Sequence, residues 1–357
     1  MKVMQYTVKA ALVVLLLLLA WGGGQTAPTP SVCASSPEAQ AEGPAGWDCL
    51  KVLDPVVLKD GSTYKMWYTG LGLDDEARIG YATSNDGITW TKYADNPVLG
   101  LGPSGSWDDS WVRVNTVLKD GDTYKMWYTG GGEVGYATSA DGIHWTKYSD
   151  NPVLEEGSPG AWDRWIVHIY VLKDGSTYKM WYSGVSDTSP SVFRIGYATS
   201  SDGITWSKRP NPVLDVGAAG SWEAQGVFDP SVIKMGASSY LMWYSGIDKP
   251  FSESNVTLRI GYATSSDGIT WTKHSGNPVL NVDPSGWDSQ SVTAPWVLYD
   301  GSTYSMWYHG GVPGGTVPEM IGYATSNNGI YWTKYSGNPV LQPTECEHVY
   351  LPVIRRN

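Results

Sequence analysis

The feature of this sequence that most constrains its fold is an internal repeat. Several short strings recur five times in the same order, at a spacing of about 60 residues. One of them, Met-Trp-Tyr, begins at Met66, Met126, Met180, Met242 and Met306. Another, a tryptophan followed by an acidic residue, begins at Trp47, Trp107, Trp162, Trp222 and Trp287. A repeated unit of this size cannot bury its apolar surface alone, so the five copies are expected to pack against one another.

Each copy has the pattern of four short β-strands. In the first copy, strands are predicted over 51–59, 64–69, 78–84 and 88–93, with turns at Asp60-Gly61-Ser62 and Asn85-Asp86-Gly87. Two hairpins per copy favour an all-β fold, a five-bladed β-propeller with four antiparallel strands per blade, over a linear solenoid. The predicted propeller covers 46–345, with blades at about 46–99, 100–154, 155–214, 215–280 and 281–341.

The two ends of the chain lie outside the repeat. Lys2 and Lys9 precede an apolar run from Ala10 to Ala20, which predicts a signal peptide over 1–27 and a disordered linker over 28–45. Residues 346–357 are expected to form a C-terminal tail. A net charge of −11 argues against nucleic acid as a partner, and no second apolar stretch approaches the length of a membrane span. We therefore expect a secreted, extracellular monomer with no membrane segment after removal of the signal.

Residues that break the repeat are the best candidates for function, because residues shared by all copies serve the scaffold. In the first strand of each copy, one column holds Asp54, Val114, His168, Asp229 and Ala294. The column two positions later, on the same side of the strand, holds Val56, Thr116, Tyr170, Ser231 and Trp296. Arg113, Trp111 and Trp165 lie close to the first column, and His309 replaces the Thr or Ser found after Met-Trp-Tyr elsewhere. Since loops of variable length open on the same face, these side chains are predicted to meet at the mouth of a central funnel.

Three segments carry a resemblance to a known superfamily. Asp229-Pro230-Ser231-Val232-Ile233, Ala294-Pro295-Trp296 and Ile260-Gly261-Tyr262-Ala263-Thr264-Ser265 resemble segments of the five-bladed furanosidase superfamily, which includes glycoside hydrolase families 43, 32, 68 and 130. The resemblance covers essentially the whole predicted mature chain. It implies a glycosidase-type site at the axis, with carboxylates on the first strands of different blades. The resemblance also allows a Ca²⁺ ion at the axis.

Glycoside cleavage needs one protonated carboxyl and one ionised carboxylate on either side of the bond. The resemblance makes Asp54 and Asp229 the candidate catalytic residues, each as base or nucleophile. Where the family often has an acid, this chain has Trp296. Glu133 and Glu223 are candidate substitutes, or Asp229 serves as the acid with Asp54 as the base. A structural role is the alternative for Glu223, since the other copies have Asp at its position.

Four aromatic residues, Trp111, Trp165, Tyr170 and Trp296, suit stacking against sugar rings because they combine a flat apolar face with a polar group. The alternative is that they fill the centre of the fold as core residues.

Three basic side chains are further candidates for substrate binding. Arg113 suits a carboxylate or a pair of hydroxyls, or it forms an ion pair with Asp54 or Asp229. His168 suits a hydroxyl or an axial ion, or it is a hydrogen-bonded core residue, and His309 is expected to point toward the same mouth. No Cys or His spacing indicates a metal site, and we predict no cofactor.

The chain has three cysteines, an odd number for an exported protein. Cys49 lies at the first predicted strand and Cys346 follows the last, so we predict a disulfide between them that closes the ring; Cys33–Cys346 is the rival pairing.

These features favour a secreted glycoside hydrolase-like enzyme that acts on furanosides or related glycans through Asp54 and Asp229. The alternative is a non-catalytic carbohydrate-binding or surface-interaction propeller that has lost its acid.

Overall fold

The computed structural model describes residues 46–313 and 318–346 of the 357-residue chain, and this part forms twenty β-strands and no helix. The first four strands are β1 (Lys51–Asp60), β2 (Thr63–Leu71), β3 (Ala77–Ser84) and β4 (Thr91–Lys92). The next four are β5 (Arg113–Asp120), β6 (Thr123–Gly130), β7 (Glu133–Ser139) and β8 (Thr146–Lys147). They are followed by β9 (Trp165–Asp174), β10 (Thr177–Val185), β11 (Phe193–Ser200) and β12 (Ser207–Lys208). Then come β13 (Gly226–Gly236), β14 (Ser239–Ile247), β15 (Leu258–Ser265) and β16 (Trp271–Lys273). The last four are β17 (Ser291–Tyr299), β18 (Tyr304–Gly311), β19 (Met320–Ser326) and β20 (Thr333–Lys334).

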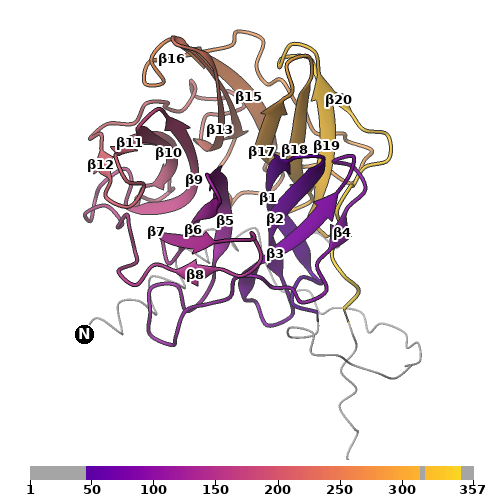
Figure 1. Cartoon of the computed structure of the whole chain (residues 1–357). Coiled ribbons are helices and arrows are strands. Elements are labelled where there is room, and N and C mark those ends of the chain that lie inside the picture. The colour runs from indigo at the N-terminus through magenta and orange to yellow at the C-terminus, as the bar shows by residue number, and fades with distance from the viewer. Residues whose placement is uncertain (1–45, 314–317, 347–357) are drawn as a thin grey trace, which may run out of the picture.

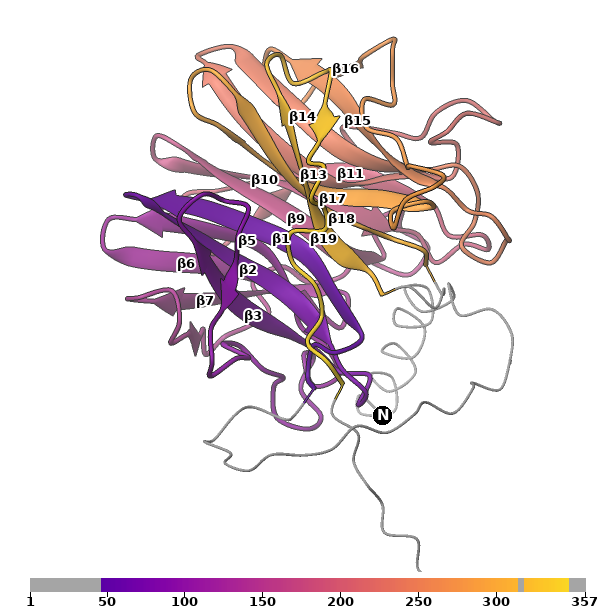
Figure 2. The same cartoon turned by 90° about the vertical axis from the view of Figure 1, so that its right-hand side faces the viewer.

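Consecutive strands pair antiparallel in groups of four, so each predicted repeat contains one four-stranded unit. The first two units are separate sheets, whereas single parallel pairs at the edges, Phe193–Gly226 and Leu258–Ser291, join the last three into one twelve-stranded sheet. The first strand of every unit lies nearest the common centre, and these strands contact one another in sequence, with β17 also contacting β1 (Figures 1 and 2).

The fourth strand of each unit is shorter than the sequence predicts. In the first unit a strand was expected over 88–93, but β4 covers only Thr91–Lys92. The Asp86 carboxylate accepts hydrogen bonds from the backbone N–H groups of Ile88 and Thr89, at 2.8 and 2.7 Å. These bonds hold a turn where the strand was expected, since an Asp side chain competes with a strand for local backbone donors.

One hydrogen bond is repeated at every junction between units. The buried Trp of each Met-Trp-Tyr string donates its indole N–H to a backbone carbonyl of the next unit. The acceptor is the glycine in the turn between the third and fourth strands of that unit. The five pairs are Trp67–Gly142, Trp127–Gly203, Trp181–Gly268, Trp243–Gly329 and Trp307–Gly87, all at 2.7–2.8 Å. The last pair joins the fifth unit to the first, so the same contact that connects neighbours along the chain also connects its two ends.

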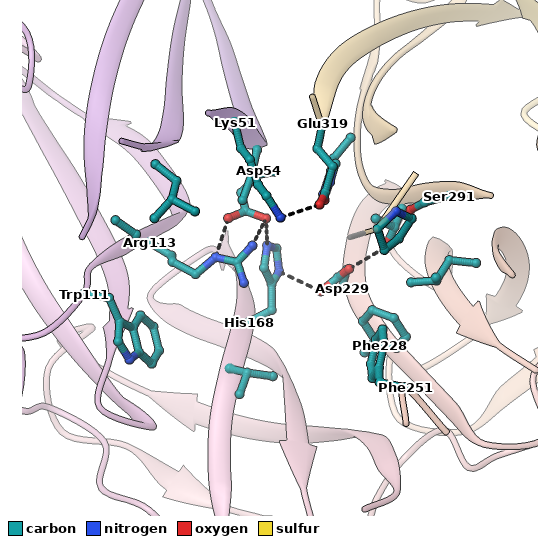
Figure 3. A pocket seen from close by; sticks show the side chains of 18 of the residues that line it. Lys51, Asp54, Trp111, Arg113, His168, Phe228, Asp229, Phe251, Ser291 and Glu319 are labelled. Atoms are coloured by element: carbon teal, nitrogen blue, oxygen red, sulfur yellow. Dashed lines mark hydrogen bonds and ion pairs between the residues drawn. The ribbon is translucent and has the colours of Figure 1, made fainter. Parts of the chain in front are cut away.

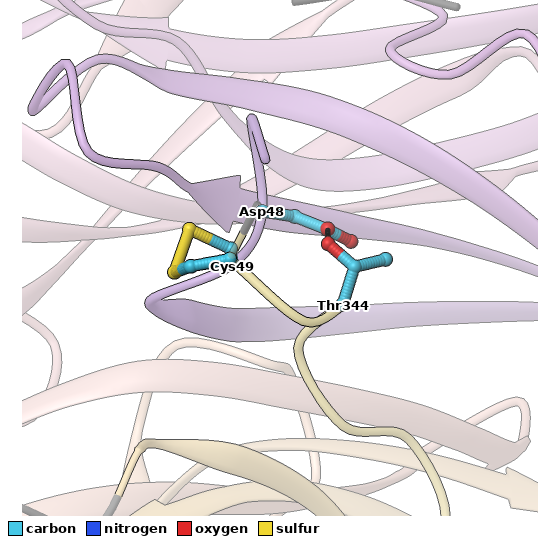
Figure 4. The surroundings of a disulfide bond; sticks show 4 residues. Asp48, Cys49 and Thr344 are labelled. Atoms are coloured by element: carbon cyan, nitrogen blue, oxygen red, sulfur yellow. Dashed lines mark hydrogen bonds between the residues drawn. A yellow bond between two sulfur atoms is a disulfide. The ribbon is translucent and has the colours of Figure 1, made fainter. Parts of the chain in front are cut away.

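The predicted disulfide between Cys49 and Cys346 is present and joins the start of the first unit to the segment that follows the fifth (Figure 4). Beside it, the Thr344 hydroxyl donates a hydrogen bond to the buried Asp48 carboxylate. Cys33, the rival partner, lies outside the described residues, as do the predicted signal peptide, the linker and most of the tail. Within the described ranges, no helix is long and apolar enough to cross a membrane.

Candidate functional site

A cavity of about 150 Å³ opens where the first strands of the five units meet. That is roughly ten times the space that one buried water needs. Charged and polar side chains line one end of it, and apolar side chains line the other (Figure 3). The polar lining residues are Lys51, Asp54, Asp75, Arg113, His168, Asp229, Ser291, Thr293, His309 and Glu319. The structure thus brings together Asp54, Arg113, His168, Asp229 and His309, all of which were selected from the sequence.

A local irregularity of the strands directs the two aspartates into the cavity. Asp54 and Asp229 both have φ of +50°, both precede a proline, and both lie in a β-bulge where the pairing register shifts. Aspartate tolerates the left-handed region better than most residues do. Ala294-Pro295 forms the same bulge in the fifth unit, with φ of +46°. The bulge therefore does not need a carboxylate, so the two aspartates have a reason to be present other than backbone geometry.

Asp54 is almost completely buried and is held by Arg113. The guanidinium donates two hydrogen bonds to the carboxylate, Nε to Oδ2 at 2.7 Å and an Nη to Oδ1 at 2.9 Å. Burial by itself raises the pKa of Asp54, but the charges of Arg113, His168 and His309 outweigh it, so the pKa lies below the usual 3.8. Asp54 is therefore an ionised carboxylate at neutral pH.

His168 lies between the two aspartates. Its Nε2 is 3.9 Å from Asp54 Oδ1 and its Nδ1 is 3.8 Å from Asp229 Oδ1 (Figure 3). Both ring nitrogens are buried, and neither makes a hydrogen bond within the described part of the chain. Since one imidazole spans the gap, the two carboxyl oxygens are at most about 10 Å apart, a limit that allows the separation of roughly 5–9.5 Å found between the carboxyls of glycoside hydrolases.

Asp229 has neutral hydrogen-bond partners. Its Oδ2 accepts bonds from the hydroxyls of Ser245, at 3.0 Å, and Thr293, at 2.8 Å. Its Oδ1 faces His168 and the cavity. The two aspartates thus differ in environment: one is paired with a guanidinium and the other with two hydroxyls.

A third buried carboxylate, Glu319, lines the cavity and was not selected from the sequence. It accepts a bond from Lys51 Nζ at 2.6 Å and its other oxygen lies 2.6 Å from His309 Nε2. Burial raises the pKa of Glu319, but the bonds and charges of His309 and Lys51 dominate and hold it well below its usual value. The residue at this position differs in every unit: the equivalents of Glu319 are Ala77, Gly132, Phe193 and Leu258. Because the position breaks the repeat, comparing the copies at this column could have selected Glu319 from the sequence.

The aromatic candidates do not all reach the cavity. Trp111 lines it, whereas Trp165 packs over Gly132, where a Cβ would lie 2.9 Å from the indole. Tyr170 and Trp296 were expected at the mouth, but their rings pack together at 5.1 Å outside the lining, and the Trp296 indole donates to the Val57 carbonyl at 2.6 Å. Two residues along a strand is about 6.6 Å, so their column lies deeper than that of Asp54.

Neither glutamate considered as the acid lies at the cavity. Glu133 begins β7 and is buried outside the lining. Glu223 accepts hydrogen bonds from the Tyr244 hydroxyl at 2.9 Å and from Lys273 at 2.8 Å. The same Tyr and Lys partners hold its equivalents Asp48, Asp108, Asp163 and Asp288, so Glu223 is part of the scaffold. Among the described residues, no group of three or more His, Cys, Asp or Glu side chains is arranged to hold a metal ion.

Comparison with solved structures identifies the architecture. A structure described as a glycoside hydrolase superposes with a TM-score of 0.65 at 21% identity, over 85% of this chain and 96% of that one. A thermostable family-43 glycoside hydrolase superposes with a TM-score of 0.59 at 18% identity, over 87% and 100% of the two chains. The chain has the fold of the β-propeller glycoside hydrolases. A member of family 130, from a study of enzymes that target beta-1,2 mannosidic linkages in Candida mannan, has a TM-score of 0.61 at 16% identity, over 81% and 88%.

Two of the relatives in sequence are an uncharacterized protein and a phosphorylase. An uncharacterized protein of Mycobacterium tuberculosis (strain CDC 1551 / Oshkosh) is 28% identical over 70% of this chain and 85% of its own length. A 1,2-beta-oligomannan phosphorylase of Thermoanaerobacter sp. (strain X514) is 29% identical over 36% of this chain and 43% of its own. No protein-family model matches the chain.

Proposed function

We propose that this protein is an exported enzyme that cleaves glycosidic bonds in furanosides or related glycans, using carboxylates at the axis of a five-bladed propeller. The observation that carries the proposal is the pair Asp54 and Asp229, which face one cavity from the first and fourth units on either side of His168. Glycoside cleavage needs two carboxyl groups roughly 5–9.5 Å apart, one on each side of the bond, and the upper limit set by His168 allows that separation.

The environments of the two aspartates suggest their roles. Asp54 is kept ionised by Arg113 and therefore suits the base or nucleophile. Asp229 has no cation within hydrogen-bond distance among the described residues and accepts bonds only from hydroxyls, so it suits the acid that protonates the leaving oxygen. Glu319, paired with Lys51 and His309, suits binding of sugar hydroxyls at the same end of the cavity.

Three observations support the remaining parts of the proposal. The Cys49–Cys346 disulfide fits an oxidising compartment and thus export. The indole-to-carbonyl bond that runs from each unit to the next, and from the fifth to the first, supports a closed ring of five blades. Each unit finds its neighbours within one chain, which fits a monomer.

The test is a panel of furanosides and oligomannosides incubated with the wild-type protein and with Asp54→Asn and Asp229→Asn. Asparagine keeps the size of the side chain and tolerates positive φ, so the bulges persist. Loss of one carboxylate should lower the rate at least about 100-fold. Asp122→Asn, at an exposed aspartate in the β5–β6 turn, is the matched control. Each reaction is run with and without inorganic phosphate, because one relative is a phosphorylase. Cleavage that survives unchanged in Asp54→Asn would exclude this site.

A second candidate, a carbohydrate-binding protein without catalysis, is favoured by the bidentate ion pair that closes Asp54, whose side chain is only 2% exposed. In that case no substrate of the panel would be cleaved, and a glycan array would still show binding that Trp111→Ala abolishes.

A further inference from the structure

The distribution of phenylalanine in this chain is unusual. The sequence contains three phenylalanines, and all three line the cavity. Phe193 begins β11, Phe228 lies on β13 beside Asp229, and Phe251 lies in the loop between β14 and β15. Because the rest of the core is built from Trp, Tyr, Met and aliphatic residues repeated in every unit, these three side chains are not part of the repeated scaffold.

The three rings form one surface. The centroids of Phe193 and Phe228 are 5.2 Å apart, and those of Phe193 and Phe251 are 5.8 Å apart. Phe193 and Phe228 are buried against the fold, whereas Phe251 is only partly buried. Trp111 lies on the opposite side of the cavity (Figure 3), so an apolar group entering here would be flanked on both sides. Leu71, Ala77, Val167 and Leu258 complete this end, which we call the apolar end.

The repeat equivalents show that the apolar end is specific to the site. The position of Phe193 is occupied by Ala77, Gly132, Leu258 and Glu319 in the other units. The position of Phe228 is occupied by Leu53, Arg113, Val167 and Thr293. Four of the five members of the first column and all of the second line the cavity. Within these two columns, Glu319 and Arg113 bring charge to one end of the cavity. Phe193 and Phe228, in the same columns, bring phenyl rings to the other end.

Sugar hydroxyls need hydrogen-bond partners when they leave water, because an unpaired buried hydroxyl is costly. The charged end supplies such partners through Arg113, Lys51 and Glu319. At the apolar end, Phe193, Phe228 and Phe251 supply none, and the one donor among the flanking rings is the buried indole N–H of Trp111, which makes no hydrogen bond in the described part of the chain. A ligand that fills the cavity therefore has a polar part and an apolar part, joined near Asp54 and Asp229.

From this arrangement we infer that the protein takes glycosides with an apolar aglycone, an alkyl or aryl group that lies against Phe193, Phe228, Phe251 and Trp111. This inference rests on the proposed function, since it names the leaving group of that reaction. In the reaction the bond between the anomeric carbon and the aglycone oxygen breaks. Asp229 gives its proton to that oxygen, a water oxygen bonds to the anomeric carbon, and the proton of the water passes to Asp54. The products are a free sugar and an alcohol or phenol.

The first experiment uses the aglycone alone, so that it does not depend on the identity of the sugar. Binding of 1-propanol, 1-butanol, 1-pentanol and 1-hexanol to the intact protein is measured by ligand-observed NMR. Each methylene that enters the apolar end should tighten binding about fourfold. Phe251→Ala should weaken hexanol binding about tenfold, whereas Phe251→Leu should keep it within about threefold. Phe251 is chosen because it lies in a loop and is only partly buried, so its loss leaves the core intact. Tyr331→Ala, at a residue that is 79% exposed and outside the lining, is the control.

The second experiment compares methyl and hexyl glycosides of a sugar that the enzyme cleaves. The hexyl glycoside should have a kcat/KM at least about tenfold higher, and Phe251→Ala should remove that preference. Affinity that is independent of chain length, or unchanged by Phe251→Ala, would overturn the inference while leaving the cleavage activity in place. Conversely, alcohol binding that tightens with chain length, in a protein that cleaves nothing, would support the apolar site and reject the enzyme.

Discussion

Arg113→Met should raise the pKa of Asp54, because burial then acts without the opposing charge of the guanidinium. Asp54, which is ionised at neutral pH in the wild type, should shift toward its protonated form. Methionine keeps the length of the apolar stem but removes both hydrogen bonds to the carboxylate, of 2.7 and 2.9 Å. The two side chains are 16% and 2% exposed, so solvent screens their interaction little. Removing one partner of such a buried pair costs about 3–5 kcal/mol of unfolding free energy at neutral pH, because the remaining charge is uncompensated.

The dependence on pH follows from the direction of each shift. In the wild type the folded-state pKa of Asp54 lies below 3.8, so its stabilisation is present above that pH and is lost as pH falls through the folded value. In Arg113→Met burial dominates, and the folded pKa should rise above the unfolded one. The variant then gains stability as pH falls between those two pKa values, by up to about 1.4 kcal/mol per pH unit. Its deficit against the wild type should therefore shrink from pH 7.5 to pH 4.5.

Urea unfolding followed by tryptophan fluorescence at pH 7.5, 6.5, 5.5 and 4.5 measures these differences. The double variant Arg113→Met with Asp54→Asn is the control, because it lacks the carboxylate whose charge causes the loss. It should recover most of the stability and much of the pH dependence of the wild type. If the single variant lost less than about 1 kcal/mol, or lost the same amount at every pH, Arg113 would not be what keeps Asp54 ionised.

Three further predictions concern the scaffold. Cys49→Ser should lower the unfolding free energy on the order of 5 kcal/mol, because the disulfide with Cys346 closes a loop with a sequence separation of 297; equal urea midpoints for variant and wild type would contradict this. Glu223→Gln should reduce the melting temperature but leave kcat on any identified substrate within about threefold, whereas a loss of about 100-fold would return Glu223 to the list of candidate acids. Trp296→Ala should cost about 3–5 kcal/mol in urea unfolding, since it removes a core side chain and leaves the Val57 carbonyl without its indole donor; an unchanged stability combined with lost glycan binding would show that Trp296 contacts sugar after all.

The fold was predictable from the sequence because its information is repeated five times. A single Met-Trp-Tyr string is ambiguous, but five copies at constant spacing indicate a unit and its neighbours at once. The end of each unit was less predictable. The Asp86 carboxylate takes two backbone donors into a turn, and that local competition shortens β4 although the following residues have good strand propensity.

The site was predictable where function breaks the repeat within a strand. Asp54, Arg113, His168 and Asp229 all lie in aligned strands, so comparing the copies was enough to select them. Glu319 ends a loop that was compared between the copies by its length alone, so the column that it shares with Ala77, Gly132, Phe193 and Leu258 was passed over. Tyr170 and Trp296 were selected for facing the axis, but strand alternation gives the side of a residue and not its depth. Whether a side chain lies at the mouth or on the floor depends on the packing of five strands together.

The hydrogen bond from Trp307 to Gly87 is the same contact that joins every other pair of neighbouring units, and the Cα atoms of Cys49 and Cys346 are only 4.9 Å apart. The junction between the fifth unit and the first is therefore held by the bond found at the other junctions, with the disulfide in addition. A circular permutant of residues 46–346 that opens at the exposed Glu155, between the second and third units, and joins residues 46 and 346 through a short linker should reach the same native structure. Because the indole-to-carbonyl bond recurs at all five junctions, that contact does not depend on which junction the chain leaves open.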